Sequence, residues 1–265
     1  MRTILITGAT AGLGQELARR LADAGDLVIV HGRDPGRVRK ARERAGGRTE
    51  GVVADLSELR QVERMAEEVL DRFDRLDVLV NNAGIGAGRP LSGREESADG
   101  IELRLAVNYL AGYHLTRRLT PLLVASAPAR VVNVASAGQQ AIDFGDPVLA
   151  RGYSRMRGYA QSKLAQIMFT FDLAEELSGQ GVTVNALHPA TFMNTSMVRE
   201  ALVPPISSVG QGATATMRLI DELDGVTGRY FDQQSESRAA AQAYDLEARK
   251  RLRHLSDELV RRALD

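Results

Sequence analysis

The chain contains no cysteine and carries no net charge, and both absences narrow what it can be. Without cysteine it can form neither a disulfide nor a thiolate metal site. Its 34 basic and 34 acidic residues balance, so the charge gives no sign of binding to nucleic acid or to an acidic membrane surface. The four histidines also lack metal-ligand spacing: His31, His114, His188 and His254. We expect no metal and no nucleic-acid partner.

Long hydrophobic runs are also missing. No apolar stretch is long enough to span a bilayer, and the first residues, MRTILITGAT, lack the apolar length of a signal peptide. We therefore expect a cytoplasmic protein that does not enter a membrane. No linker rich in Pro, Gly or Ser interrupts the 265 residues, so a single domain over 1–265 is expected.

What the chain does have is a regular alternation of short β-branched runs and longer amphipathic segments. The candidate strands are apolar nearly throughout, as strands covered on both faces are: 3–7, 27–31, 51–55, 77–81, 130–136, 182–188 and 228–232. Helical spacing covers 13–24, 57–72, 98–118, 158–178 and 209–222. This order predicts an α/β, doubly wound, Rossmann-like fold. Its mostly parallel sheet has about seven strands, flanked by helices on both faces.

Three segments interrupt the alternation. Residues 137–158 and 190–208 follow the C-terminal ends of strands, where ligands bind in open α/β sheets. Because 190–203 is rich in apolar residues, we interpret 190–208 as a lid over a partly hydrophobic substrate. The Arg- and Glu-rich tail, 237–265, has helical spacing and predicts a surface helix. A cover over the substrate pocket is the alternative for this tail.

A glycine-rich turn follows the first predicted strand. In TGATAGLG, Gly8, Gly12 and Gly14 precede a predicted helix. Glycines permit a tight turn and close backbone approach, and a helix N-terminus offers free N–H groups to a pyrophosphate. At the head of an α/β chain this turn predicts a dinucleotide site.

The end of the second predicted strand, VIVHGRD, favours NADP. Gly32 stands where NAD sites tend to carry an acid for the ribose 2′-OH, and Arg33 can bind a 2′-phosphate. Asp34 either serves as a late acid or caps the next helix, with Pro35 at its first position. NAD remains the alternative, because the glycine turn itself has no basic residue.

Two tyrosines in RGYSRMRGYAQSK are each followed four residues later by a basic residue. Lys163 lies one helical turn beyond Tyr159, and a nearby cation lowers the pKa of a phenol from ~10. Only three of the 34 basic residues are lysines, which makes this spacing improbable by chance. The alternative is an amphipathic helix whose lysine reaches into solvent. Tyr153 lies in the preceding connection, so we interpret its spacing to Arg157 as incidental and Tyr153 as a candidate for the pocket wall.

Five motifs together resemble the short-chain dehydrogenase/reductase superfamily: TGATAGLG, NNAG (81–84), VNVAS (132–136), YAQSK (159–163) and HPA (188–190). The YAQSKLAQ helix, the 137–158 connection and the GRYF end are similar to its retinol-dehydrogenase-like branch. The resemblance implies an NADP(H)-dependent oxidoreductase that interconverts a small-molecule alcohol and a ketone or aldehyde. It makes Tyr159 the acid/base, Lys163 its tuning cation and a ribose ligand, and Ser136 the group that polarises the substrate oxygen. Asn108 would support the lysine through water.

The resemblance also implies further nucleotide contacts, from Leu13, Asp55, Leu56, Asn82, Ala83, Gly84 and Pro189, with Asn81 stabilising the sheet. Asp55 has capping of the next helix as an alternative. Ala190 replaces the family's usual glycine, which leaves Thr191 and Thr195 as candidates at the nicotinamide, and we favour Thr195. The other functions to consider are an NAD-preferring alcohol dehydrogenase and a catalytically silent nucleotide-binding regulator. Apolar positions around the helix from 159 fit a homodimer, or equally a helix beneath the tail.

Overall fold

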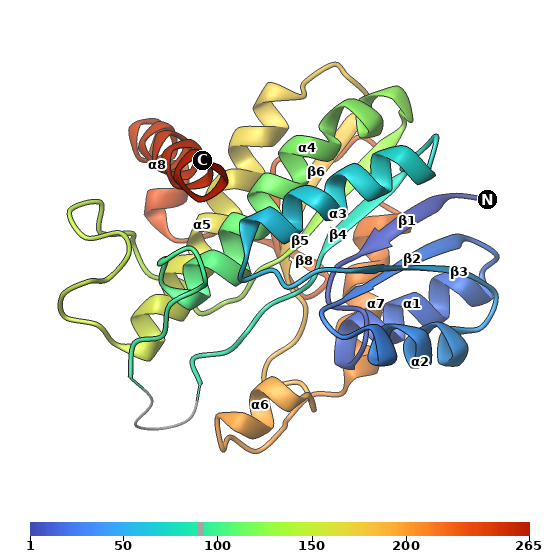
Figure 1. Cartoon of the computed structure of the whole chain (residues 1–265), viewed down its shortest axis with the longest axis horizontal. Helices are drawn as coiled ribbons and strands as arrows, with labels where there is room; N and C mark the ends of the chain where they lie inside the picture. Colours follow the sequence, from blue (N-terminus) through green and yellow to red (C-terminus); the bar gives the residue numbers. More distant parts are fainter. Residues whose placement is uncertain (89–92) are drawn as a thin grey trace.

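An eight-stranded sheet runs through the centre of the molecule in the order β3-β2-β1-β4-β5-β6-β7-β8 (Figure 1). The computed structural model describes residues 1–88 and 93–265. Neighbouring strands are parallel, except that β8 runs antiparallel to β7. The strands are β1 Thr3–Ile6, β2 Leu27–Gly32, β3 Arg48–Val53, β4 Val78–Asn81, β5 Ala129–Val134, β6 Val182–His188, β7 Arg229–Asp232 and β8 Ser235–Ser237. The predicted doubly wound, Rossmann-like fold is confirmed.

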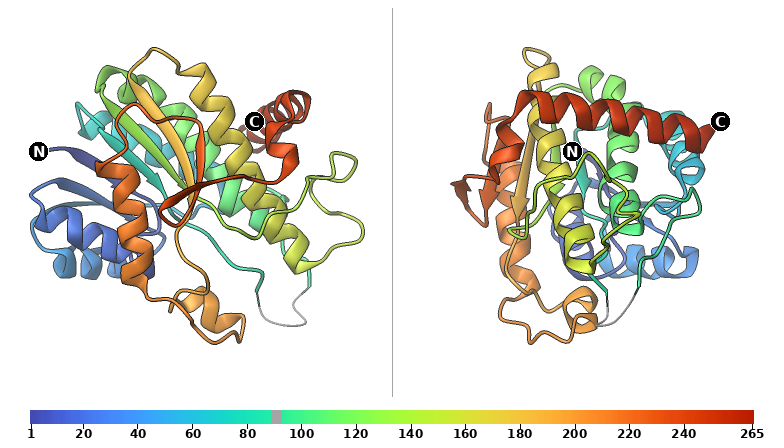
Figure 2. Two further views of the ribbon diagram at one scale, coloured as in Figure 1. Left: turned by 180° about the vertical axis from the view of Figure 1, so that it is seen from behind. Right: turned by 90° about the vertical axis from the view of Figure 1, so that its left-hand side faces the viewer.

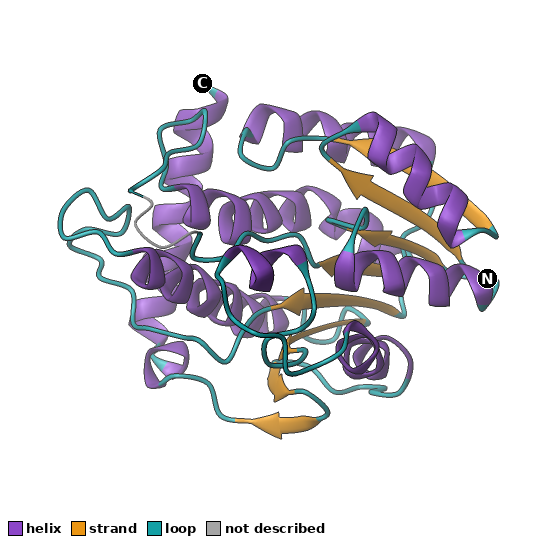
Figure 3. Ribbon diagram, turned by 90° about the horizontal axis from the view of Figure 1, so that it is seen from below, coloured by secondary structure: helices purple, strands orange, loops and turns teal. Residues whose placement is uncertain are grey.

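Helices cover both faces of this sheet (Figure 3). One face carries α1 Gly12–Asp23, α2 Pro35–Ala45 and α7 Val209–Asp221, and the other carries α3 Leu59–Arg72, α4 Ala111–Ala125 and α5 Arg155–Glu176. Because strand side chains alternate, Leu5 of β1 enters one core while Ile4 and Ile6 enter the other. The remaining helices in the described residues are η1 Leu105–Leu110, α6 Ser196–Glu200, η2 Ala241–Tyr244 and α8 Leu246–Leu264. Among the described residues, no helix combines the length and apolar character needed to cross a membrane.

Some predicted bounds are shifted, since α5 begins at Arg155 where 158 was predicted and β3 spans Arg48–Val53 where 51–55 was predicted. Three further differences concern whole elements. The helical stretch predicted at 98–118 consists of the π-helical turn η1 followed by α4, which continues to Ala125. Strand β8 and the short helix α6 were not predicted. The residues of β8, SES, are all polar and exposed, and the five residues of α6 are too few to show helical periodicity. The sheet therefore has eight strands, where about seven were predicted.

The tail forms α8, which lies against α3 and α5 (Figure 2). Leu252 and Leu259 are buried in the core beneath it. The hydroxyls of Tyr109 and Tyr113 bond to Ser256 Oγ (2.7 Å) and Asp257 Oδ1 (2.6 Å). The tail is thus a surface helix with one packed face. Packing against α8 explains the apolar positions on α5 that also fitted a homodimer interface. The homodimer itself stays a prediction.

A buried histidine joins the first three strands where the glycine turn begins. Nδ1 of His31 accepts from the Gly8 N–H (3.1 Å), so Nε2 donates to the Ala54 carbonyl (3.0 Å). Burial lowers the pKa of His31 to about 4, although the Ala54 bond and the nearby Asp55 oppose this shift. Protonation would turn Nδ1 from acceptor to donor, which breaks the bond to Gly8.

Replacing Leu252 by Ala tests whether the tail belongs to the cooperative core. Its side chain is 2% exposed, so the free energy of unfolding should fall by about 2–5 kcal/mol in urea denaturation. Leu246→Ala, at a position of α8 that is 57% exposed, is the control and should change little. If the two substitutions lower the free energy of unfolding equally, α8 does not unfold cooperatively with the rest of the domain.

His31 should make stability depend on pH. Its pKa is lower in the folded protein than the ~6.5 of an unfolded chain, so its neutral form stabilises the fold above that value. This contribution, about 3 kcal/mol, should be lost as the pH falls from ~6.5 to 4. Urea denaturation across this range measures it, and His31→Gln should flatten the curve relative to the wild type. Parallel curves for the two proteins would contradict the role of His31.

Candidate active site

The predicted site residues meet at one edge of the sheet. Gly8 follows β1, Asn82 follows β4, Ser136 follows β5 and Pro189 follows β6. Because these strands are parallel, their C-terminal ends lie side by side. Residues far apart in the sequence therefore surround one region, as predicted.

The glycine turn is shaped by close backbone approach. Gly8 and Gly12 have φ angles of +66° and +54°, and α1 begins at Gly12. A Cβ on Gly8 would lie 2.8 Å from Cα of Ala83, and one on Gly14 would lie 2.5 Å from the Gly8 carbonyl oxygen. Leu13 is buried in the core beneath the turn. A turn that excludes side chains at the head of a helix fits a pyrophosphate, as the dinucleotide prediction requires.

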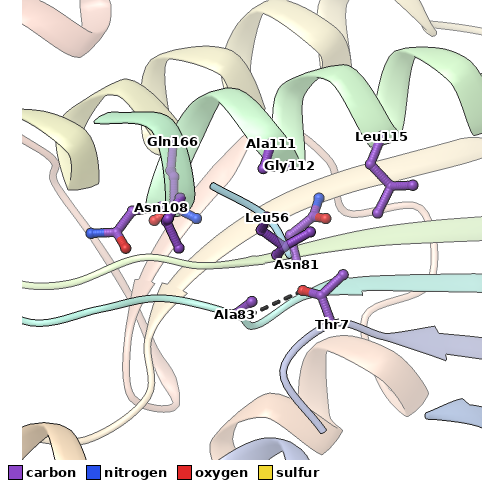
Figure 4. A pocket seen from close by; sticks show the side chains of 10 residues that line it. Thr7, Leu56, Asn81, Ala83, Asn108, Ala111, Gly112, Leu115 and Gln166 are labelled. Atoms are coloured by element: carbon purple, nitrogen blue, oxygen red, sulfur yellow. Dashed lines mark hydrogen bonds between the residues drawn. The ribbon is translucent and has the colours of Figure 1, made fainter. Parts of the chain in front are cut away.

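The loop after β4 forms hydrogen bonds to the glycine turn and to Thr7 before it. Asn82 Nδ2 donates to the carbonyls of Thr7 (2.8 Å) and Gly8 (3.2 Å), so its side chain fixes the turn. The backbone N–H of Ala83 donates to Thr7 Oγ1 (3.0 Å), as the dashed line in Figure 4 marks. Asn81 Nδ2 instead bonds to Asn133 and Thr116, which matches the predicted role in the sheet.

Three residues at the end of β2 lie where a dinucleotide's 2′-hydroxyl or 2′-phosphate is expected to bind. A Cβ on Gly32 would lie 2.4 Å from Cγ2 of Thr10, so this position has no room for an acidic side chain. Asp34 Oδ1 accepts from the Arg37 N–H (2.7 Å), which makes Asp34 the N-cap of α2. Arg33 is exposed beside them. Of the two roles considered for Asp34, the structure therefore shows the cap.

Asp55 and Leu56 follow β3. Oδ1 of Asp55 accepts from the N–H and hydroxyl of Ser57 (2.9 and 2.8 Å). Burial acts to raise the pKa of Asp55, but these bonds and the charge of Arg33 lower it overall. Asp55 thus fixes the turn before α3, whose N-cap is Glu58. Leu56 is buried and lines a small cavity between the sheet and α4 (Figure 4).

Ser136 and Tyr159 face each other across the segment after β5. A Cβ on Gly138 would lie 3.5 Å from Ser136 Oγ and 3.7 Å from Cε1 of Tyr159. Ser136 Oγ accepts from the Gly138 N–H (3.0 Å), which orients its hydroxyl. Burial raises the pKa of Tyr159, and the Ser136 hydroxyl lowers it in part. The two groups predicted to act on one substrate oxygen are therefore brought together.

Lys163 lies on the same face of α5 as Tyr159. Its Nζ is 5.9 Å from the centroid of the Tyr159 ring, and it donates to the Val134 carbonyl (2.9 Å) and to Gln166 Oε1 (2.8 Å). Burial lowers the pKa of Lys163 to about 7. A Cβ on Gly84 would lie 3.5 Å from Nζ, so the loop after β4 closes directly over the amine. Gln166 was not among the predicted site residues, although its position one helical turn from Lys163 on a largely apolar helix is a signal that the sequence contains.

Asn108 connects the loop after β4 to α5, mainly through hydrogen bonds to the backbone of Ile85. Its Oδ1 accepts from the Ile85 N–H (2.7 Å), and its Nδ2 donates to the Ile85 carbonyl (3.1 Å) and to Ser162 Oγ (3.0 Å). It stands within the π-helical turn η1. Its side chain thus joins the loop after Gly84 to α5, and none of these bonds reaches Lys163.

Tyr153 does not pair with Arg157. The guanidinium of Arg157 binds Asp143 (2.9 Å), and the hydroxyl of Tyr153 is buried without a hydrogen-bond partner among residues 1–88 and 93–265. Tyr153 precedes α5, whose N-cap is Ser154. The spacing of Tyr153 and Arg157 is therefore incidental, as predicted.

The segment before α8 holds the 137–158 connection in place. Gln139 Nε2 donates to the Ser136 carbonyl (3.0 Å), and its Oε1 accepts from the Ala240 N–H (2.8 Å). The side chain of Gln242 bonds to both the N–H and the carbonyl of Ile142 (2.6 and 3.0 Å). These contacts, which no sequence pattern indicated, connect the segment that follows Ser136 to the C-terminal part of the chain.

The segment 190–208 is closed at its base and lies near the glycine turn. The N–H of Ile206 bonds to the Phe192 carbonyl (3.1 Å), and Met193 pairs with Ser207. Cγ2 of Thr195 is 3.2 Å from where a Cβ of Gly12 would stand, whereas Thr191 Oγ1 bonds to His188 Nε2 (3.1 Å). Thr195 therefore faces the glycine turn, and Thr191 does not. Pro189 packs toward α7, 3.5 Å from a Cβ placed on Gly212.

Comparisons with known proteins agree with this geometry. A family model described as short chain dehydrogenase matches residues 2–203. Human Retinol dehydrogenase 13 is 33% identical over 284 residues, covering 98% of this chain and 84% of its own. Mouse Retinol dehydrogenase 14 is 35% identical over 291 residues, covering 98% and 86%.

Solved structures show the same fold. An uncharacterized protein from Mycobacterium Paratuberculosis superposes with a TM-score of 0.81 at 29% identity, covering 98% of this chain and 94% of its own. The Pseudomonas aeruginosa RhlG/NADP active-site complex has a TM-score of 0.72 at 28% identity, covering 87% and 94%. The 3-ketoacyl-(acyl-carrier-protein) reductase from Brucella melitensis complexed with NADH has a TM-score of 0.70 at 26% identity, covering 87% and 96%.

These matches and the assembled site lead to one conclusion. The chain belongs to the short-chain dehydrogenase/reductase family, in its retinol-dehydrogenase-like branch, and is an oxidoreductase of the kind that uses a nicotinamide dinucleotide.

Proposed function

We propose that the protein is an NADP(H)-dependent oxidoreductase that interconverts an alcohol and a ketone or aldehyde, with Tyr159 as the acid/base. The observation that carries this proposal is the meeting of Ser136, Tyr159 and Lys163 beside the glycine turn. A nucleotide-binding regulator would need the turn alone. The intact set of three therefore favours catalysis over the silent alternative.

Each of the three side chains has a distinct part in the reduction. A bound nicotinamide supplies the hydride that reaches the carbonyl carbon. Tyr159 donates its hydroxyl proton to the carbonyl oxygen and becomes phenolate, and Ser136 donates a hydrogen bond to that oxygen as negative charge develops on it. In its protonated, ammonium form, Lys163 stabilises the phenolate of Tyr159, because a nearby cation lowers the pKa of a phenol. Oxidation of the alcohol runs through the same groups in reverse.

The preference for NADP rests on the end of β2. No acid fits at Gly32, and Asp34 is engaged as a helix cap. Arg33 forms no ion pair among the described residues, so its guanidinium is available to a 2′-phosphate. The solved relatives include one NADP complex and one NADH complex, so similarity alone does not distinguish the two nucleotides. The proposal of NADP therefore depends on Gly32, Arg33 and Asp34.

An apolar substrate is favoured by the lid. Phe192, Leu202 and Ile206 are 48%, 77% and 70% exposed, and all three lie in 190–208. The relatives named as retinol dehydrogenases are consistent with a hydrophobic alcohol or aldehyde. We infer a substrate whose carbonyl is carried on an apolar body.

Arg33→Ser tests the choice of nucleotide. The wild type should oxidise NADPH in preference to NADH, and the substitution should raise KM for NADPH at least about tenfold, since it removes a charge-assisted contact. The KM for NADH should change little. Steady-state kinetics with both nucleotides measures this, with Arg44→Ser on the exposed end of α2 as control. A wild type that prefers NADH would reject the NADP assignment.

Tyr159→Phe tests the acid/base role. Turnover on a panel of aldehydes and ketones of graded size should fall by about 10²–10⁴, because the proton donor is lost. Binding of NADPH, followed by its fluorescence, should remain within a few-fold of wild type. If the wild type binds NADPH but turns over no member of the panel, the regulator becomes the better account.

A further inference from the structure

The buried amine of Lys163 depends on very few partners. The side chain is 3% exposed, and the acceptors within hydrogen-bond distance of Nζ are the Val134 carbonyl and the side-chain oxygen of Gln166. Among the described residues, no carboxylate forms an ion pair with it. An ammonium ion in such a place is stabilised only by neutral dipoles, so each acceptor matters more than it would in water.

We propose that Gln166 is a positioning residue of this site, whose side-chain oxygen holds Nζ of Lys163 in place and stabilises its ammonium form. The inference rests on the proposed function, in which charged Lys163 acts on Tyr159. Gln166 acts through Lys163 and touches neither the substrate nor the reacting atoms.

The geometry explains why one glutamine can do this. Lys163 and Gln166 are three residues apart on α5, which places them on one face of the helix. Gln166 is 4% exposed and lines the small cavity with Asn108 (Figure 4). Bulk water therefore has little access to replace it. Two of the three ammonium N–H groups are occupied by Val134 and Gln166, which leaves the third free for the ribose or the phenol.

A second buried glutamine on the same helix provides a matched control. Gln161 is also 4% exposed, and its Nε2 donates to the Ala141 carbonyl (2.8 Å). It forms no hydrogen bond to Lys163. Replacing either glutamine by leucine removes one buried amide from α5, so a loss of packing should affect both variants alike.

The three lysines of the chain make a direct test possible. Lys40 and Lys250 are exposed, so Lys40→Arg and Lys250→Arg leave Lys163 as the only lysine for ¹³C labelling and NMR titration. Gln166→Leu should lower the titration midpoint of Lys163 by about one pH unit, the effect of losing a hydrogen bond to a charged group. Gln166→Glu should raise it by at least about one unit, because an adjacent carboxylate favours the ammonium. Gln161→Leu should leave it within about 0.2 unit.

The outcomes separate this inference from the proposed function. Equal shifts in Gln166→Leu and Gln161→Leu, or no rise in Gln166→Glu, would overturn the role of Gln166. If Gln166→Leu does not fold, Gln166→Glu against wild type decides alone. Since the titration needs no substrate, shifts in the expected directions in a protein without turnover would keep the positioning role and reject the oxidoreductase proposal. Where turnover is present, the pH profile of kcat should move in the same direction as the midpoint.

Discussion

Burial of the Lys163 amine between α5 and β5 is the constraint on which the rest of the site depends. A charged amine is costly in a dry interior unless neutral acceptors surround it. The end of β5 provides one at Val134, and α5 provides another at Gln166. The loop after β4 passes close to the amine, since a Cβ on Gly84 would lie at van der Waals distance from Nζ, 3.5 Å away. Contacts of this one amine thus connect the end of β5, helix α5 and the loop after β4.

The glycine turn is likewise held by a small number of contacts from neighbouring segments. Gly8 approaches Ala83 so closely that a Cβ on Gly8 would lie 2.8 Å from Cα of Ala83. Asn82 bonds to two carbonyls of the turn, and His31 accepts the Gly8 N–H from the opposite side. The turn is therefore held by side chains from β2 and from the loop after β4. Its shape is a property of the sheet edge, which explains how a short, glycine-rich segment can stay organised.

Sequence alone predicted the sheet well, and its motifs contained the residues that the structure brings together at one sheet edge. The inner strands are apolar on both faces, and the glycine turn, Ser136, Tyr159 and Lys163 stand in short motifs with fixed spacing. The exposed strand β8 gave no such pattern. The π-helical turn around Asn108 was also hidden, because an apolar helical run does not reveal where its hydrogen bonding changes register.

Contacts between distant segments were beyond the reach of sequence patterns. Gln139 meets Ala240 and Gln242 meets Ile142 about a hundred residues apart, and no local periodicity encodes such a pair. The two roles considered for Asp34 were likewise separated only by the observed bond to the Arg37 N–H. In the site itself, motif spacing suggested the proposed reacting groups, while the residues that contact them became visible only in the folded structure.

The measurement that tests the central claim most directly is the transfer of deuterium from labelled NADPH. The protein is given a ketone or aldehyde from the graded panel together with NADPH that carries deuterium in both hydrogen positions of the hydride-bearing nicotinamide carbon. The account predicts one deuterium on the former carbonyl carbon of the alcohol product for each NADPH oxidised. Oxidation of NADPH without deuterium on that carbon, or tight binding of NADPH with no alcohol formed from any carbonyl, would contradict it.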